Sequence, residues 1–383
     1  MTPHWPDARR NKMPNKKSET NVMPLLNDAQ ATTQDSAPAS VDLNAPGIAK
    51  ALSKRIADDI DEYCAKAYDD GHRNHLGGSL IGDSCSRKLW YSFRWCLHEK
   101  HSGRQQRLFN RGHREEERFI EWLEGIGAQV FYEDRDGFWY HAESDCYGIS
   151  KEGETMDSLC EWVRPTDSNY LHHVSRAKAD GLKFPQYRVS AVMGHFGGSL
   201  DGIAILPERY GIKDPVLLEF KTNGTGAGFN KLGDSGMSVA KPLHFAQTST
   251  YGSDEAYRFT HVLYLNINKN DDSIHVEVVK LDWNLGDQMR NKAERIILSQ
   301  VPPPRLSDNP TFRDCGWCAM KDICHKGAIP EKNCRSCAHA RPVENKGWWC
   351  DLHSPQANEN IPKEVIPKGC DSYFPITATV KND

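Results

Sequence analysis

A short apolar run in the middle of the chain constrains the fold most. Residues 216–222, VLLEFKT, follow a proline and end before an Asn-Gly turn, which predicts a buried strand. Side chains alternate along a strand, so Glu219 and Lys221 project from the same face. A carboxylate and an ammonium at one spot of a buried strand favour a chemical role, although such a pair is often only a solvated ion pair.

A second carboxylate is expected beside this pair. Residues 199–206 can pair antiparallel with the strand through the loop PERYGIKD, which brings Asp201 toward Glu219. Two carboxylates at a sheet edge suit Mg²⁺ or Mn²⁺, and the backbone carbonyl of Phe220 is a further candidate ligand. Lys221 would then orient a metal-bound water or offset charge on a phosphate.

A helix that begins at Pro242 adds polar side chains to the same region. His244, Gln247 and Tyr251 fall at i, i+3 and i+7 and therefore share one helical face. With this helix, the chain resembles the PD-(D/E)xK nucleases of the RecB type, whose pattern is Asp, then Glu-x-Lys, then Gln-x3-Tyr. The runs GHFGGSLDG, LEFKT and KPLHFAQ look closest to the phage-borne single-chain branch, akin to the CRISPR-associated RecB-like exonucleases, over residues 80–326.

The resemblance implies an α/β fold, a restriction-endonuclease-like mixed central sheet flanked by helices, with a small C-terminal metal-stapled appendage. It also implies a metal-dependent DNA exonuclease that hydrolyses phosphodiester bonds in recombination, repair or phage replication. The substrate would be single-stranded DNA or duplex ends, and a recombination or replication protein would be a partner. Gln247 and Tyr251 would position the scissile strand, and His113, in RGHREEE, would be a third metal ligand, with Glu116 as a weaker candidate.

Two other functions fit the same residues. One is a non-catalytic DNA-end or partner-binding protein that uses a nuclease fold only to present a basic strip. The other is an endonuclease or spacer-processing enzyme, whose catalytic residues would be the same. The sequence does not separate exonuclease from endonuclease action.

The basic strip covers residues 82–114, where arginines and lysines alternate with aromatic residues. Basic groups grip phosphates and aromatic rings stack on bases, as in a single-strand channel. An amphipathic helix with its aromatic residues in the core would have the same composition. We expect Trp90 and Phe93 in the core, and Arg87, Lys88 and Arg94 on the DNA.

Eight of the twelve cysteines form two sets. Cys85 stands far upstream of Cys315-x2-Cys318-x5-Cys324, and four thiolates suit either zinc or an iron-sulfur cluster. The alternative is a zinc site in which His325 joins the three C-terminal cysteines and Cys85 is an ordinary buried thiol. The resemblance implies a structural [4Fe-4S] cluster held by all four cysteines.

The second set is Cys334-x2-Cys337-x12-Cys350-x19-Cys370, with His353 near its third member. Two such pairs in a tail too small for its own core predict a structural zinc site. Cys64, Cys96, Cys146 and Cys160 lack ligand spacing and are expected to be buried.

Composition limits the remaining options. The net charge of -4 disfavours a bulk electrostatic DNA binder. Mean hydropathy is -0.67, and no apolar run reaches the ~18 residues of a membrane-spanning helix, so a cytoplasmic protein is expected. Residues 1–46 are predicted to be a disordered arm with a basic start, 47–326 the nuclease domain closed by the cluster, and 327–383 a small zinc module with four cysteine ligands.

Periodicity predicts further elements around the site. Helices are expected at residues 48–68, packed onto the core, at 108–126 and at 285–298. Strands are expected at 261–267 and, as an edge strand, at 273–281. Residues 131–189 show no convincing period and are expected to be an irregular insertion or short strands. His195 is expected to hydrogen-bond within the turn that positions Asp201.

Overall fold

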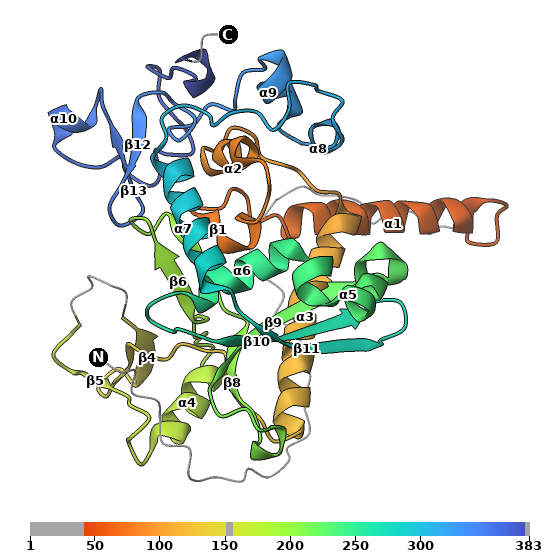
Figure 1. The fold of residues 1–383 in the computed structure, drawn as a ribbon, viewed down its shortest axis with the longest axis vertical. Helices are drawn as coiled ribbons and strands as arrows, with labels where there is room; N and C mark the ends of the chain where they lie inside the picture. Colours follow the sequence, from red (N-terminus) through yellow and green to blue (C-terminus); the bar gives the residue numbers. More distant parts are fainter. Residues whose placement is uncertain (1–41, 151–155, 380–383) are drawn as a thin grey trace.

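A computed structural model describes residues 42–150 and 156–379, so most of the predicted N-terminal arm lies outside the described residues. The described chain is a mixed α/β structure in which several sheets lie among helices (Figure 1). Across these two ranges, no helix is long and apolar enough to cross a membrane.

The central sheet has the strand order β11-β10-β9-β8-β2. Strands β9 and β10 are parallel, and the other neighbours are antiparallel. The predicted strand at 216–222 is confirmed as β9, and its antiparallel partner as β8. The strands are β2 (Gln129–Phe131), β8 (Gly202–Ile205), β9 (Val216–Asn223), β10 (His261–Asn268) and the edge strand β11 (Ile274–Lys280).

Helices cover both faces of this sheet. Leu218 and Phe220 point to the face covered by α3, where the ring of Phe119 stacks on Phe220 with centroids 4.9 Å apart. Burying each such ring contributes about 2 kcal/mol. The opposite face, which carries Glu219, is covered by α6, with α7 packed on α6 (Figure 1). These helices are α3 (Gly103–Gly125), α5 (Asn230–Ala240), α6 (Pro242–Gly252) and α7 (Trp283–Leu298).

A small second sheet leads the chain into the central one. Its order is β1-β7-β6, and a two-residue break, Leu200 and Asp201, separates β7 from β8. Trp90 and Phe93 are buried, as predicted. The elements are β1 (Leu76–Gly77), α2 (Ser86–Phe93), β6 (Arg188–Ala191) and β7 (Phe196–Ser199).

The described part of the segment at 131–189 forms short strands, one of the two alternatives expected from the sequence, and a helix that was not expected. Three short strands form an antiparallel sheet of order β4-β3-β5, followed by α4. Phe138, Val174 and Phe184 form a core of their own beneath it. The elements are β3 (Phe138–His141), β4 (Cys146–Ile149), β5 (Cys160–Trp162) and α4 (Tyr170–Ala179). Cys146, predicted to be buried, is exposed at the start of β4.

The C-terminal segment shares the core of the main body. Trp348 lies 5.5 Å from Phe93, ring to ring, and both belong to one cluster with residues of α7. His195 is buried, and its Nε2 lies 2.9 Å from the carbonyl oxygen of Val343 rather than within the turn before Asp201. The elements here are α8 (Arg313–Gly316), α9 (Lys321–Lys326), β12 (Ala340–Val343), β13 (Gly347–Cys350), α10 (Ser354–Ala357) and the 3-10 turn Ile376–Thr379.

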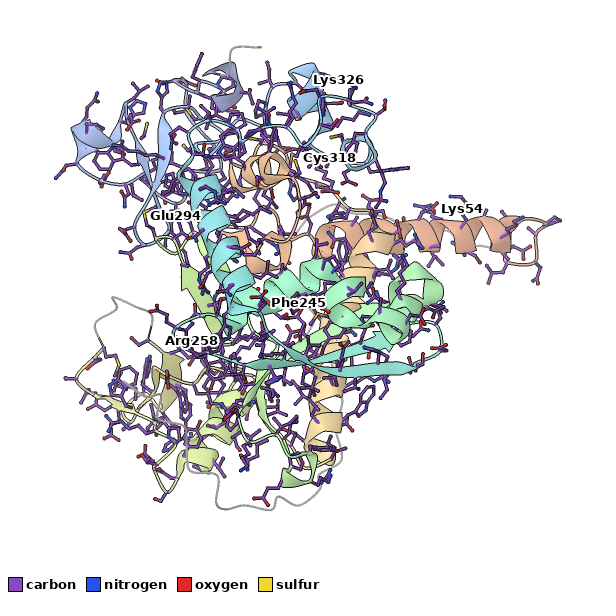
Figure 2. All side chains as sticks on the ribbon, in the orientation of Figure 1. Lys54, Phe245, Arg258, Glu294, Cys318 and Lys326 are labelled. Carbon is purple, nitrogen blue, oxygen red and sulfur yellow. The ribbon has the colours of Figure 1, made fainter. Side chains whose placement is uncertain are left out.

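The helix predicted at 48–68 forms as α1 (Ile48–Ala67), but most of it does not pack onto the core. Its contacts run along α3, and Ile56, Ile60 and Tyr63 are exposed. Figure 2 shows Lys54 on the part of α1 that projects from the body. The period of an amphipathic helix therefore predicted its existence correctly and its packing incorrectly.

Candidate active site

Glu219 and Lys221 share one face of β9, as their spacing predicted. Glu219 is only 1% exposed, and its Oε1 forms an ion pair with Lys221 Nζ. Its other carboxylate oxygen, Oε2, accepts a hydrogen bond of 3.2 Å from Gln247 Nε2 on α6. Both oxygens of a buried carboxylate are thereby held in place.

Asp201 joins the pair through the backbone of β9. It occupies the break between β7 and β8, and its Oδ2 accepts a hydrogen bond of 2.6 Å from the amide of Phe220. Because Gly202 lies opposite Leu218 in the antiparallel register, Asp201 is placed at the level of Glu219. The structure thus brings together the three side chains expected from the D, ExK pattern.

The electrostatics of this cluster favour a cation. Burial and the nearby charge of Glu219 raise the pKa of Asp201 to about 7, and burial raises the pKa of Glu219 against the pull of Lys221. Burial lowers the pKa of Lys221, yet the charges of Glu219 and Asp201 outweigh that effect and raise it. Two carboxylates against one ammonium leave an excess of negative charge away from bulk water, which a divalent cation would offset.

Helix α6 packs on the face of the sheet that carries Glu219. Gln247 and Tyr251 are both buried, so their contacts are with the protein. A Cβ at Gly198 would lie 2.0 Å from the Tyr251 hydroxyl oxygen, and a Cβ at Gly78 would lie 2.5 Å from its ring. Glycines at these two positions leave the space that the ring occupies. Gln247 therefore holds Glu219 through its hydrogen bond, and Tyr251 packs against the two glycines. Their positioning of a scissile strand stays a prediction.

The predicted third ligand, His113, lies on the exposed surface of α3, where the charge of Asp201 is among the causes that raise its pKa. The His113 side chain is 76% exposed, and its Nδ1 lies 3.3 Å from Glu116 Oε1, a contact that raises the pKa of the imidazole. Glu116 also raises the pKa of both Asp201 and Glu219, although burial and the charges within the cluster have larger effects on both groups. Glu116, the weaker candidate from sequence, is thus the α3 residue whose charge reaches both carboxylates.

A complete ligand set is not assembled. Within residues 42–150 and 156–379, no three His, Cys, Asp or Glu side chains are grouped so that they could hold a metal ion. The expected set of His113, Asp201, Glu219 and the Phe220 carbonyl therefore remains a prediction beyond the placement of the two carboxylates.

Sequence reasoning missed a polar group on β10. Residues 261–267 were predicted only as a buried strand, but Tyr264 and Asn266 lie beside Glu219 and Lys221 in the parallel register. The Tyr264 hydroxyl contacts His244 Nδ1 at 2.9 Å and accepts a hydrogen bond of 3.0 Å from Asn266 Nδ2. The missed signal is the alternation of polar residues from Tyr264 onward, at Tyr264, Asn266 and Asn268, which points one face of an otherwise apolar strand at a polar site.

The first cysteine set converges on one cavity of about 530 Å³ between α2 and the α8–α9 segment. Cys85 caps the start of α2, and its sulfur accepts a hydrogen bond of 3.4 Å from the amide of Lys88. Figure 2 labels Cys318 in this region. The cavity is lined by all four predicted ligands, Cys85, Cys315, Cys318 and Cys324.

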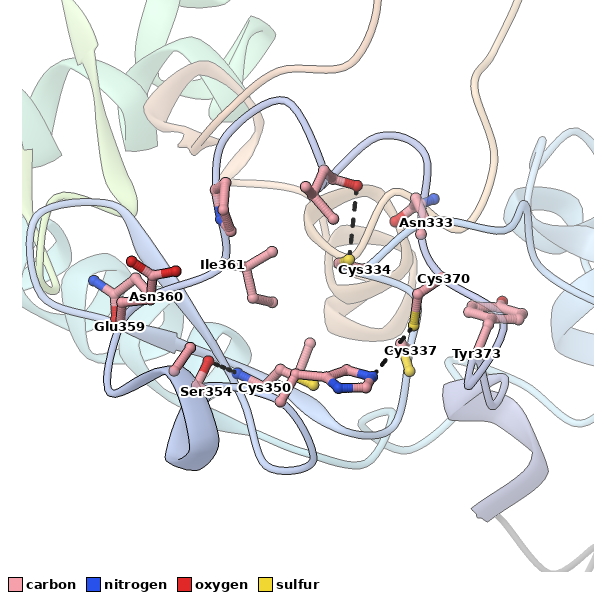
Figure 3. Close-up of a pocket in the computed structure, with 16 residues that line it drawn as sticks. Asn333, Cys334, Cys337, Cys350, Ser354, Glu359, Asn360, Ile361, Cys370 and Tyr373 are labelled. Atoms are coloured by element: carbon pink, nitrogen blue, oxygen red, sulfur yellow. Dashed lines mark hydrogen bonds between the residues drawn. The ribbon is translucent and has the colours of Figure 1, made fainter.

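The second set lines a smaller cavity of about 220 Å³ near the C-terminus (Figure 3). Cys334, Cys337, Cys350 and Cys370 all border it, together with His353. His353 Nε2 lies 3.9 Å from Cys370 Sγ, and Cys337 Sγ accepts a hydrogen bond of 3.5 Å from the amide of Phe374. As with the first set, the four thiols face a common space without forming a closed ligand group.

The DNA contacts predicted for residues 87–94 need correction. Arg94 is 0% exposed, its Nη1 donates to the carbonyl oxygen of Ala340 at 2.7 Å, and its guanidinium lies over the ring of Trp348. Arg87 is also buried and donates to the carbonyl oxygen of Pro303 at 2.7 Å. Only Lys88 keeps an exposed ammonium, which is paired with Asp83. The aromatic residues that accompany these arginines in the sequence belong to the core, and the arginines follow them into it.

Comparison with known proteins finds distant similarity to solved structures. No model of a protein family matches the chain, and no curated protein matches it. The crystal structure of SSO0001 is 12% identical over 70% of this chain and 96% of that chain, with a TM-score of 0.34. The alkaline exonuclease LHK-Exo from Laribacter hongkongensis is 14% identical over 61% of this chain and 90% of that chain, with a TM-score of 0.29. Its complex with dAMP aligns at 14% identity and a TM-score of 0.29, over 61% of this chain and 89% of that chain.

Proposed function

We propose that this protein is a metal-dependent deoxyribonuclease that hydrolyses phosphodiester bonds. One observation carries the proposal: the Phe220 amide holds Asp201 at the level of the buried Glu219–Lys221 pair. Two carboxylates and a lysine are the set that metal-assisted phosphodiester hydrolysis needs. A purely structural ion pair would not require the second, half-buried carboxylate, whose presence raises the cost of keeping both charged.

The side chains divide the work. Asp201 and Glu219 would hold Mg²⁺ or Mn²⁺, which supplies a polarised phosphodiester and a water of lowered pKa when bound. Lys221 offsets charge that develops on the phosphate, and Gln247 holds Glu219 in the orientation described above. Their fit to a divalent cation rests on the excess negative charge of the buried pair. His113 and the Phe220 carbonyl are proposed as further ligands, with Glu116 as an alternative to His113.

We propose exonuclease action on single-stranded DNA or duplex ends, in the cytoplasm, during recombination, repair or phage replication. A recombination or replication protein is the proposed partner. The resemblance of the D, ExK and Gln-x3-Tyr pattern to RecB-type nucleases supports this finer assignment. Burial of Arg87 and Arg94 leaves the DNA path to other basic side chains.

The two cysteine sets are proposed to hold structural metals. For Cys85, Cys315, Cys318 and Cys324 we propose a [4Fe-4S] cluster, supported by their common cavity and by Arg87, whose Nη1 lies 3.9 Å from Cys324 Sγ and would offset cluster charge. For Cys334, Cys337, Cys350 and Cys370 we propose Zn²⁺, with His353 at hand.

The test is cleavage of 5′- and 3′-end-labelled single- and double-stranded DNA by wild type and Glu219→Ala in Mg²⁺, Mn²⁺ and EDTA. Metal-dependent cleavage that disappears in the variant supports the assignment, and the product ladders distinguish exonuclease from endonuclease action and give the polarity. Tight DNA binding without cleavage by folded wild type would instead establish the non-catalytic DNA-end binder.

A further inference from the structure

Lys221 has a buried polar neighbour, Asn266, on the adjacent strand β10. In the parallel register of β9 and β10, Asn266 lies directly beside Lys221, and Tyr264 directly beside Glu219. Side chains at paired positions of neighbouring strands project from the same face. Asn266 is 0% exposed, so its amide group must find its partners inside the protein.

The hydrogen bonds around Tyr264 fix the orientation of the Asn266 amide. Asn266 Nδ2 can only donate, and it donates to the Tyr264 hydroxyl at 3.0 Å. The same hydroxyl lies 2.9 Å from His244 Nδ1. Burial, with the charges of Lys221 and Lys241, lowers the pKa of His244 to about 3, so the ring is neutral. In the tautomer with its proton on Nε2, Nδ1 accepts the hydroxyl proton. The direction of this chain, from Asn266 through Tyr264 to His244, turns Asn266 Oδ1 away from the tyrosine.

That oxygen is an acceptor without a donor. Asn266 Oδ1 is buried and has no hydrogen-bond partner. The ammonium of Lys221 carries three N–H donors, and the Glu219 carboxylate oxygen is its ion-pair partner. An orphaned carbonyl oxygen beside a lysine with donors to spare is a place the ammonium can move to.

We propose that Asn266 is a positioning residue for Lys221. Its Oδ1 accepts a hydrogen bond from Lys221 Nζ whenever the ammonium leaves Glu219. The ammonium then stays over the site, on the side of β10, instead of turning to solvent. Its catalytic consequence rests on the proposed function, but the contact itself does not.

A matched residue on the same strand serves as the control. Asn268 lies two positions along β10, on the same face, and is 1% exposed. Its Oδ1 already accepts hydrogen bonds from Thr225 Oγ1 at 3.2 Å and from the amide of Asn270 at 3.1 Å. It has the chemistry and burial of Asn266 without the free acceptor.

A crystal structure of metal-free Glu219→Ala tests the contact, with Glu219→Leu, which also lacks side-chain oxygens and fills more of the space, as the second variant should the first not fold. Removing the carboxylate is expected to place Lys221 Nζ within about 3.2 Å of Asn266 Oδ1. A lysine that points to solvent while Oδ1 stays unpaired would overturn the proposal. This readout needs no cleavage, so it can fail or succeed independently of the nuclease assignment.

Kinetics test the consequence. Asn266→Leu is expected to lower kcat about tenfold at unchanged KM, because the lysine is held less well. In a Lys221→Met background the same change should have no further effect on the residual rate. Asn268→Leu is expected to lower Tm while leaving kcat unchanged. Equal losses from Asn266→Leu in both backgrounds, or a wild-type kcat in the folded variant, would refute the positioning role.

Discussion

Neutralising Asp201 should stabilise the metal-free protein at alkaline pH. Burial and the charge of Glu219 raise the pKa of this carboxyl from 3.8 to about 7. The folded protein therefore binds a proton that the unfolded chain has already released in this window. Its stability falls as the pH rises from 3.8 through about 7, and the penalty is complete above that range.

The magnitude follows from the shift. A change of about 3 units at about 1.4 kcal/mol per unit sets an upper limit of roughly 4 kcal/mol. Asp201 and Glu219 titrate as a pair, so we assign about half of it, roughly 2 kcal/mol, to Asp201 alone. Asparagine keeps the size of the side chain and an oxygen that can accept from the Phe220 amide. Asp201→Asn should therefore raise Tm by about 3 °C at pH 8.5.

The assay is thermal unfolding in EDTA at pH 5.5 and pH 8.5, with Asp59→Asn on the exposed part of α1 as control. The gain is expected only in Asp201→Asn and should be about half as large at pH 5.5 as at pH 8.5, because pH 5.5 lies midway between the unfolded pKa of 3.8 and the folded pKa of about 7. The variant should also lose stabilisation by Mg²⁺ and lose cleavage. An equal gain at pH 5.5 would show that the effect does not come from charge. An unchanged or lower Tm at pH 8.5 would refute the repulsion between the two carboxylates.

Three further predictions test the surroundings of the site. Gly198→Ala should lower the free energy of unfolding by about 2–3 kcal/mol, because its Cβ would lie 2.0 Å from the Tyr251 hydroxyl oxygen. Gly233→Ala is the control and should not destabilise, since a Cβ there has nothing within 4 Å. Urea unfolding compares the two variants, and equal free energies would contradict the packing around Tyr251. Cys318→Ser should lose iron and retain zinc in elemental analysis of anaerobically purified protein, and loss of both metals together would argue against separate sites. Arg94→Ala should lower the free energy of unfolding by about 3 kcal/mol, because the buried guanidinium donates to backbone carbonyl oxygens. The DNA affinity of the folded variant should be unchanged. Loss of DNA binding without loss of stability would restore the predicted contact with DNA.

Local patterns were enough to predict the centre of the site. A two-residue period in β9 placed Glu219 and Lys221 on one face, and a proline placed the start of α6 correctly. The antiparallel pairing that carries Asp201 needed only a short loop between β8 and β9. Each of these inferences concerns residues that are close in sequence.

The errors involve partners that are distant in sequence. Arg94 bonds to Ala340, and His195 contacts Val343. Nothing near either residue in the chain reveals these partners, so a basic or polar side chain was assigned to a nearby function. The polar face of β10 is a different case. Its alternation of polar and apolar residues was visible in the sequence, but the pairing of Asn266 with Lys221 on the neighbouring strand was not.

The joining of the C-terminal segment to α2 has a consequence for synthesis. Arg335 donates through its guanidinium to the carbonyl oxygens of Arg73, Asn74 and Phe93, and it lies over the ring of Trp348. A ribosome that has translated only as far as α9 has already made every side chain of the carboxylate site. The aromatic and guanidinium groups that complete the packing around α2 have not yet been made. The core around α2 can therefore be completed only after the C-terminal segment has been synthesised. A chain truncated before Arg335 would contain every residue of the carboxylate site but would lack part of this core.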